Sequence, residues 1–182
     1  MQSIRNGNDM KKILAICLLM IAVQTQAKNK YEPDCEVSGF NNQKTCFIKP
    51  YGVWVDNKKT ALSSVSFGGT WTSAAPESVG LSILFGDAAT NIKSVAFNLD
   101  GDISEFKIDI LSNKVSRQGR LSNTTALAIV PVEYLRQLVQ SKNAKYRVST
   151  ITDGYREGSF YSTKGVASEP INTLKALLNK ME

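Results

Sequence analysis

The sequence contains no histidine, and this absence excludes a large class of reactions. A Ser-His-Asp or Cys-His site needs an imidazole to accept the proton of the nucleophile. Most zinc sites also combine histidine with cysteine and carboxylates. We therefore expect no histidine-based hydrolase, no metal centre and no cofactor in this chain.

Cysteine is also scarce, with 3 residues in a chain of 182. Cys17 lies in an apolar segment near the N-terminus, so Cys35 and Cys46 remain as a pair. An even number of cysteines in an exported chain predicts a disulfide. Because the spacing is not that of a Cys-x-x-Cys redox pair, we predict a structural bridge between Cys35 and Cys46.

Long apolar runs are missing as well. The stretch ILAICLLMIAV at 13–23 is shorter than the about 20 apolar residues that a membrane-spanning helix needs. Lys11 and Lys12 precede it, and the small residues Thr25 and Ala27 follow it. This order is typical of a secretory signal peptide that is cleaved after Ala27. We predict export, to the periplasm or out of the cell, without a transmembrane anchor.

The predicted signal peptide covers 1–27, and Met10 is an alternative start because it directly precedes the lysine pair. The mature chain, 28–182, has a length typical of one domain. Over the full 182 residues the charge is scattered, with 22 Lys and Arg against 16 Asp and Glu, a net charge of +6. Such an excess favours solubility or attraction to anionic surfaces.

The rest of the chain has the alternating pattern of β-strands, interrupted by two segments with helical spacing. Asp-Gly turns predict hairpins around 100–101 and 153–154. Amphipathic helices are expected at 131–142 and 168–181. We expect an irregular arm at 28–42, a loop at 68–78, and a weak strand or a loop at 112–123. The predicted fold is α+β, one domain with a largely antiparallel sheet of hairpins. The predicted strands are 45–49, 51–55, 61–67, 79–85, 93–99, 103–110, 126–130, 145–152 and 155–163.

Two constellations resemble chemical sites without meeting their requirements. The run from Asn98 to Ser104 places oxygen ligands at alternate positions, as a calcium loop does, but it lacks the glycine and the bidentate glutamate of that loop. Asp102, Glu105 and Asp109 alternate with apolar residues, which is typical of a solvent-facing strand surface. Paired carboxylates or a Ser-Lys pair leave a histidine-free hydrolase as an alternative hypothesis.

Basic and aromatic residues gather in the second predicted hairpin, at Lys145, Arg147, Tyr155 and Arg156. Such a mixture is typical of surfaces that bind anionic glycans or nucleic acid, and export disfavours nucleic acid. The alternative is an ordinary exposed strand face with a cross-strand pair of Arg147 with Glu157.

Trp71 lies in the predicted loop of small residues, where an exposed tryptophan would be a binding anchor; the alternative is a lid over the edge of the core. No stretch resembles a known family. We predict an exported, non-catalytic binding or accessory protein, whose partner is an envelope protein, a toxin or enzyme, or a glycan. The alternatives are the histidine-free hydrolase and a carrier of an apolar ligand.

Overall fold

The computed structural model describes residues 29–58 and 63–181. The predicted signal peptide at 1–27, with its cleavage after Ala27, lies outside the described residues. So does the start of the strand predicted at 61–67. Within the described part, no helix is both long enough and apolar enough to cross a membrane.

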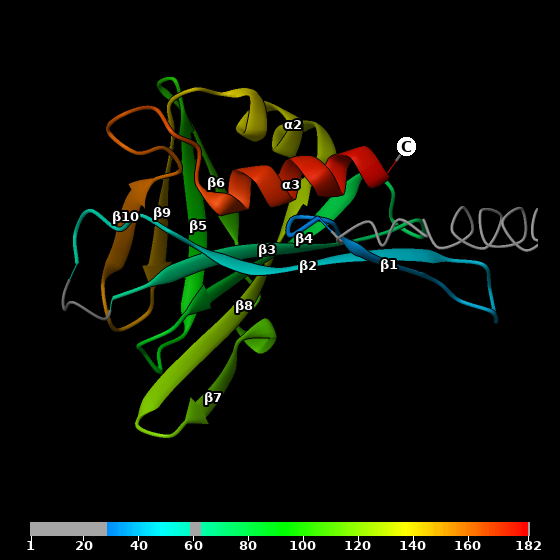
Figure 1. Cartoon of the computed structure of the whole chain (residues 1–182). Helices are drawn as coiled ribbons and strands as arrows, with labels where there is room; N and C mark the ends of the chain where they lie inside the picture. The colour runs from blue at the N-terminus through cyan, green and yellow to red at the C-terminus, as the bar shows by residue number, and fades with distance from the viewer. Residues whose placement is uncertain (1–28, 59–62, 182) are drawn as a thin grey trace, which may run out of the picture. The chain divides into compact units, whose positions relative to one another are not determined.

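The described residues form two antiparallel sheets, two α-helices and a short 3-10 helix (Figure 1). One sheet has six strands in the order β1-β2-β3-β4-β8-β7, and the other has four in the order β10-β9-β5-β6. All strand pairs within them are antiparallel, which confirms the predicted α+β class. The elements are β1 (Asp34–Val37), β2 (Lys44–Val53), β3 (Val65–Thr72), β4 (Ser78–Phe85), β5 (Ile92–Leu99), β6 (Asp102–Lys107), the short 3-10 helix η1 (Ile110–Ser112), β7 (Lys114–Gln118), β8 (Leu121–Pro131), α2 (Val132–Gln140), β9 (Ala144–Thr150), β10 (Tyr155–Ser159) and α3 (Glu169–Lys180).

The core lies on one face of the six-stranded sheet. In β4 every second residue from Val79 to Phe85 is buried, as the sequence pattern predicts. Part of this face packs against the four-stranded sheet through a cluster of aromatic side chains, and another part is covered by α3. The aromatic cluster contains Phe67, Phe97, Tyr146 and Phe160, with ring centroids 5.1 to 6.1 Å apart in the pairs Phe67–Phe160 and Phe67–Phe97.

Both helices begin close to the predicted positions. Helix α2 buries the apolar stripe Val132, Leu135, Leu138 and Val139, and α3 buries Ile171, Leu174 and Leu178 with others. Gly69 leaves room for α3 to approach the sheet, because a Cβ there would lie 3.2 Å from Leu177. The apolar face of α3 packs on the sheet, and that of α2 packs on α3 and on β8, as the faces of amphipathic helices do.

The first hairpin has the predicted tight turn. Asp100 and Gly101 both have positive φ, of 55° and 111°, which is the requirement of a type I′ turn. In the second hairpin the connection between the strands is longer than the predicted two-residue turn. The amide of Thr150 bonds to the carbonyl of Gly154, so the strands are joined by a loop rather than by two residues.

The predicted loop at 68–78 is wrong in its first half. Strand β3 continues through Gly68 to Thr72. Gly68 is required there by close packing, because a Cβ would lie 2.7 Å from the Ile48 carbonyl oxygen and from the Pro50 nitrogen. Glycine usually indicates a turn, but it also occurs where two backbones approach closely. The segment at 112–123, for which a weak strand or a loop was predicted, contains β7 and the start of β8, so the strand alternative is correct.

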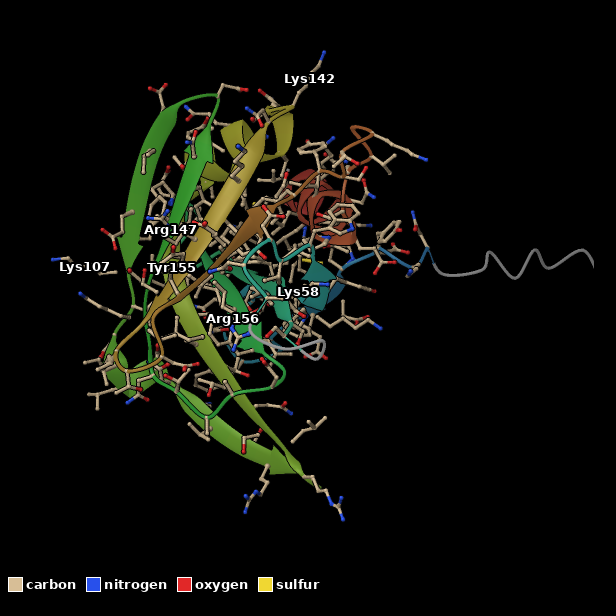
Figure 2. All side chains as sticks on the ribbon, turned by 90° about the vertical axis from the view of Figure 1, so that its left-hand side faces the viewer. Lys58, Lys107, Lys142, Arg147, Tyr155 and Arg156 are labelled. Atoms are coloured by element: carbon tan, nitrogen blue, oxygen red, sulfur yellow. A yellow bond between two sulfur atoms is a disulfide. The ribbon has the colours of Figure 1, made fainter. Side chains whose placement is uncertain are left out.

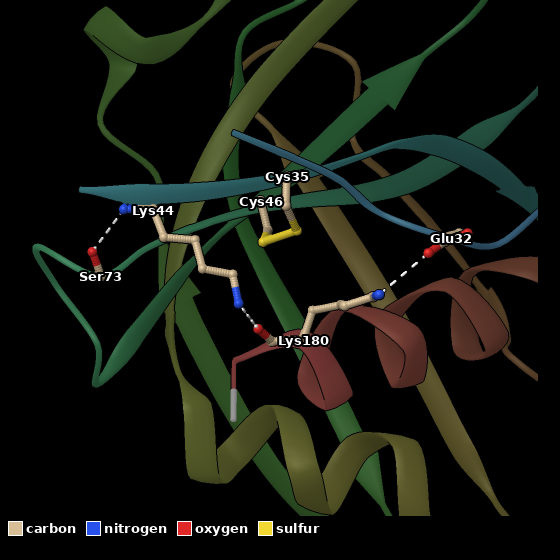
Figure 3. The surroundings of a disulfide bond; sticks show 6 residues. All are labelled: Glu32, Cys35, Lys44, Cys46, Ser73 and Lys180. Atoms are coloured by element: carbon tan, nitrogen blue, oxygen red, sulfur yellow. Dashed lines mark hydrogen bonds and ion pairs between the residues drawn. A yellow bond between two sulfur atoms is a disulfide. The ribbon is translucent and has the colours of Figure 1, made fainter. Parts of the chain in front are cut away.

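The predicted irregular arm at 28–42 contains β1, which is held to the rest of the fold by the predicted disulfide. Cys35 and Cys46 lie directly opposite each other in the β1–β2 ladder and are joined by a disulfide (Figure 3). Helix α3 is tied to the chain on both sides of this disulfide. Nζ of Lys180 lies 3.2 Å from Oε1 of Glu32, and the backbone carbonyl of Lys180 accepts a hydrogen bond from Nζ of Lys44. The described residues from Tyr31 onward belong to one compact unit.

Candidate functional site

The strongest candidate site lies on the outer surface of the four-stranded sheet. Alternation along β9 turns Tyr146 and Val148 toward the core, so Lys145 and Arg147 point outward. Tyr155 of β10 lies opposite Ser149, on the same side as Arg147. We call this surface the basic face; it consists of Ala96, Asn98, Ile103, Glu105, Lys107, Lys145, Arg147, Tyr155 and Glu157.

Arg147 is held in place by two neighbours on β10. Its Nε and Nη2 atoms lie 2.9 and 2.8 Å from Oε2 of Glu157, and its guanidinium lies over the ring of Tyr155, 4.7 Å from the centroid (Figure 2). The predicted cross-strand pair of Arg147 with Glu157 is therefore confirmed. Stacking and pairing orient the guanidinium plane, and Nη1 has no partner among the described residues. An oriented arginine with a free donor suits a carboxylate, sulfate or phosphate group.

A depression of about 170 Å³ lies next to Arg147. Ala96 lies between Arg147 and Glu105 in the strand register. Because its side chain is short, the surface of the sheet is recessed at this position. Lys145 and Ile103 also line the depression. An apolar floor beside a few polar groups is the usual form of a small binding site.

Two further cationic side chains of the basic face have no ion-pair partner among the described residues. Lys145 and Lys107 form no ion pair within the described part of the chain, and Glu105 forms none there either. Figure 2 shows Lys107 at the side of the sheet that carries Arg147. The basic face therefore has a modest positive excess, with Arg147 neutralised in part by Glu157. Lys107 was not among the predicted site residues, although its alternation with Phe106 is a signal for an outward position.

Comparisons with protein-family models, with curated proteins and with solved structures gave no match to this chain.

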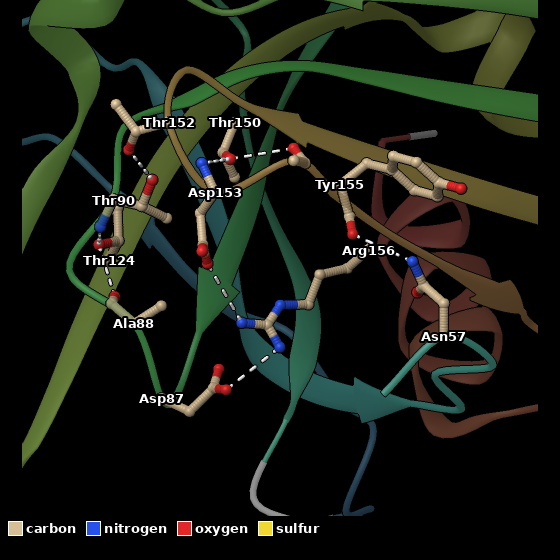
Figure 4. Close-up of polar contacts among 11 residues, drawn as sticks. Asn57, Asp87, Ala88, Thr90, Thr124, Thr150, Thr152, Asp153, Tyr155 and Arg156 are labelled. Carbon is tan, nitrogen blue, oxygen red and sulfur yellow. Dashed lines mark hydrogen bonds and ion pairs between the residues drawn. The ribbon is translucent and has the colours of Figure 1, made fainter. Parts of the chain in front are cut away.

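Arg156 does not belong to the basic face, in contrast to the prediction. Because side chains alternate along a strand, the neighbour of the outward Tyr155 must point inward. Arg156 is 3% exposed, and its Nη1 lies 3.1 Å from Oδ2 of Asp87 (Figure 4). Asp153 lies 3.8 Å from Nη2, and the ring of Phe85 packs against the guanidinium. Arg156 is a buried link between the sheets.

Trp71 is also placed differently from the expectation of an exposed loop anchor. It lies in β3, is 6% exposed, and donates from Nε1 to the carbonyl of Pro76 at 3.2 Å. Trp54, in contrast, is 42% exposed, and its carbonyl accepts a hydrogen bond of 2.6 Å from the hydroxyl of Tyr146. A tryptophan without an exposed surface cannot serve as a surface anchor, so we build no site on Trp71.

The oxygen-rich run at 98–104 stabilises its own turn. Oδ1 of Asn98 accepts from the amide of Gly101 at 2.8 Å, and Oδ2 of Asp100 accepts from the hydroxyl of Ser141 at 3.0 Å. Oδ1 of Asp109 accepts from the amide of Leu111 and caps η1. Among the described residues, no three Cys, Asp or Glu side chains gather closely enough to hold a metal ion.

Proposed function

We propose that this chain is an exported, non-catalytic binding protein whose basic face holds an anionic group of a partner in the periplasm or outside the cell. The observation that carries the proposal is the arrangement of Arg147, stacked on Tyr155 and beside the depression at Ala96. The partner is an acidic glycan, because carboxylate or sulfate groups pair with arginine while sugar rings pack on a shallow apolar floor.

The disulfide supports the proposed compartment. Disulfides form and persist in oxidising surroundings and are rare in reduced cytosol. The bridge joins Cys35 of an edge strand to Cys46, which is fully buried. Because the disulfide joins two paired residues of a regular strand ladder, it has a structural role. A structural disulfide agrees with a protein that works outside the cytosol.

The two alternative functions gain less from the structure. A carrier needs a hollow interior, yet the space between the sheets holds the cluster of Phe67, Phe97, Tyr146 and Phe160. A hydrolase with paired carboxylates needs one of them desolvated, whereas Asp102 and Glu105 are exposed. The histidine-free hydrolase stays a hypothesis without further support.

The proposal is tested with a charged and an uncharged polysaccharide of the same backbone, dextran sulfate and dextran. We expect the protein to bind dextran sulfate, to ignore dextran, and to lose affinity as salt rises, because exposed charges are screened. Replacing Lys145 and Arg147 together by alanine should weaken binding about tenfold or more, since each contact of this kind contributes about 1 kcal/mol.

The matched control is Lys175→Ala, which removes an exposed cation from α3. It lowers the net charge but leaves the basic face intact, so binding should change less than twofold. The melting temperature of each variant checks that the fold is kept. Equal loss from Lys175→Ala and from the Lys145 and Arg147 double variant would show attraction by net charge alone and would contradict the proposal.

A further inference from the structure

A second concave site lies on the opposite face of the β5–β6 hairpin, next to its turn, and is independent of the basic face. An open cleft of about 430 Å³ separates the β5–β6 turn from α2. We call it the α2 cleft. It is lined by Asp100, Asp102 and Ser104 on the hairpin side and by Tyr134, Gln137 and Gln140 on the helix side, with Leu99 and Ser141 completing it.

The helix side of the cleft follows from the spacing of the sequence. Tyr134, Gln137 and Gln140 are three residues apart, so they lie one above the other on one face of α2. That face differs from the buried stripe of Leu135, Leu138 and Val139 that holds the helix to the core. The two amides are therefore presented to the cleft by a helix that is fixed by packing.

The hairpin side contributes two carboxylates without a countercharge. Asp100 is oriented by the hydroxyl of Ser141 at 3.0 Å, and the carbonyl of Ser141 in turn accepts from Tyr161 at 2.7 Å. Asp102 forms no ion pair in the part of the chain that the structure describes. The lining of the cleft contains no Lys and no Arg. In a chain with a net charge of +6, this cleft is locally negative.

We propose that the α2 cleft binds a protonated amine that also carries hydroxyl groups, such as an amino sugar. The two carboxylates attract the cation, because opposite charges about 4 Å apart gain energy even near water. Each glutamine amide both donates and accepts, which matches hydroxyl groups that do the same. An anionic sugar would be repelled by Asp100 and Asp102, and an apolar ligand would cover polar groups without pairing them.

Tyr134 closes the back of this site with its ring, while its hydroxyl group is buried. Burial raises the pKa of its hydroxyl, and the Ser104 hydroxyl partly opposes this shift. The ring of Tyr134 packs edge-on against Phe106, with centroids 4.9 Å apart, so the side chain is fixed at the back of the cleft. A ligand thus meets a wall that is already ordered.

The test compares glucosamine, glucose and glucuronate, which share a pyranose ring but carry a positive, no and a negative charge. Titrations followed by NMR should show saturable shifts of the Gln137 and Gln140 side-chain amides with glucosamine. We expect an affinity about fivefold lower for glucose, and no shifts with glucuronate. Equal affinities for the three sugars, or no shifts with glucosamine, would overturn the proposal.

Two variants of the same strand give a matched comparison. Asp102→Asn removes one charge from the cleft and should weaken glucosamine binding about fivefold. Glu105→Gln removes the same charge from the opposite side of β6, on the basic face, and should leave binding unchanged. If both variants lose affinity equally, the cleft does not hold the cation. The Lys145 and Arg147 double variant should bind glucosamine normally, so failure of the basic face and failure of the α2 cleft are separable.

Discussion

Nη1 of Arg156 lies 3.1 Å from Oδ2 of Asp87, and this pair joins the two sheets. Arg156 belongs to β10 of the four-stranded sheet, and Asp87 follows β4 of the six-stranded sheet. The two side chains are 4% and 9% exposed, so their attraction is only weakly screened by water. Hydroxyl groups continue the connection nearby, where Thr90 contacts both Thr124 of β8 and Thr152 of the β9–β10 loop (Figure 4).

The first prediction concerns this buried pair. Arg156→Ala should lower the free energy of unfolding by about 3–5 kcal/mol, because it leaves the carboxylate of Asp87 buried without a partner. Arg147→Ala removes an arginine from an exposed pair with Glu157 and should cost at most about 1 kcal/mol. Urea unfolding at pH 7 measures both values. Equal costs for the two variants would show that Arg156 does not link the sheets energetically.

The second prediction concerns pH. Burial raises the pKa of Tyr146, the charge of Asp56 raises it further, and Arg156 partly opposes the shift. A folded-state pKa above the unfolded value gives stability that is present below pH about 10 and falls as the pH rises further. We expect the free energy of unfolding to decline above pH 10, with Tyr134 and Tyr161 shifting in the same direction.

Tyr146→Phe tests the source of this decline. The variant loses the hydrogen bond to the Trp54 carbonyl and should be about 1–2 kcal/mol less stable at pH 7. Because phenylalanine does not ionise, its stability should fall less steeply than that of the wild type between pH 9 and 11. Parallel curves for the two proteins would assign the alkaline decline to other groups.

The third prediction concerns the disulfide. Cys35 and Cys46 are 11 positions apart, and closing a loop of this size contributes about 3 kcal/mol in the chain-entropy description. Dithiothreitol should lower the free energy of unfolding by this amount, with reduction checked by intact mass. The double variant Cys35→Ser, Cys46→Ala should not respond to dithiothreitol. A reduced wild type as stable as the oxidised protein would contradict the role of the bridge.

The fourth prediction concerns Gly158. A Cβ there would overlap the carbonyl oxygen of Trp54 and would lie 2.8 Å from the hydroxyl of Tyr146. Gly158→Ala should therefore cost about 1–3 kcal/mol, as overpacking usually does. Gly52→Ala is the matched control, because no atom lies within 4 Å of its added Cβ. Thermal unfolding compares the stability of the two variants. If Gly158→Ala were as stable as Gly52→Ala, the segment at Trp54 would move away from the added methyl group without measurable cost.

The elements that were predicted correctly from the sequence are those whose apolar residues repeat at the spacing of one buried face. Strand β4 and both helices were predicted because each has a single apolar face. The β5–β6 turn was predicted because a type I′ turn requires positive φ, which Gly accepts and Asp tolerates. The end of β3 was missed because Gly68 and Gly69 indicate a loop in sequence, whereas their actual role is to let β2 and α3 approach. That role depends on residues that lie far away in the chain.

The candidate sites show the same limit. Lys145, Arg147 and Tyr155 are on one face as alternation requires, but Arg156 was grouped with them by sequence proximity, against the alternation of β10. The α2 cleft was not predicted at all. Its two sides come from a hairpin turn and a helix, and their approach is decided by core packing that no local pattern records.

The segment that follows β2 runs along the outer edge of β10. The amide of Asp56 donates to the carbonyl of Glu157 at 2.9 Å, and the side chain of Asn57 bonds to the backbone of both Tyr155 and Glu157. Backbone groups of an edge strand would otherwise invite a strand from another molecule. In the described part of the chain, this cover leaves β6 as the open margin of the four-stranded sheet. Any growth of that sheet by a foreign strand would have to begin there, beside the α2 cleft.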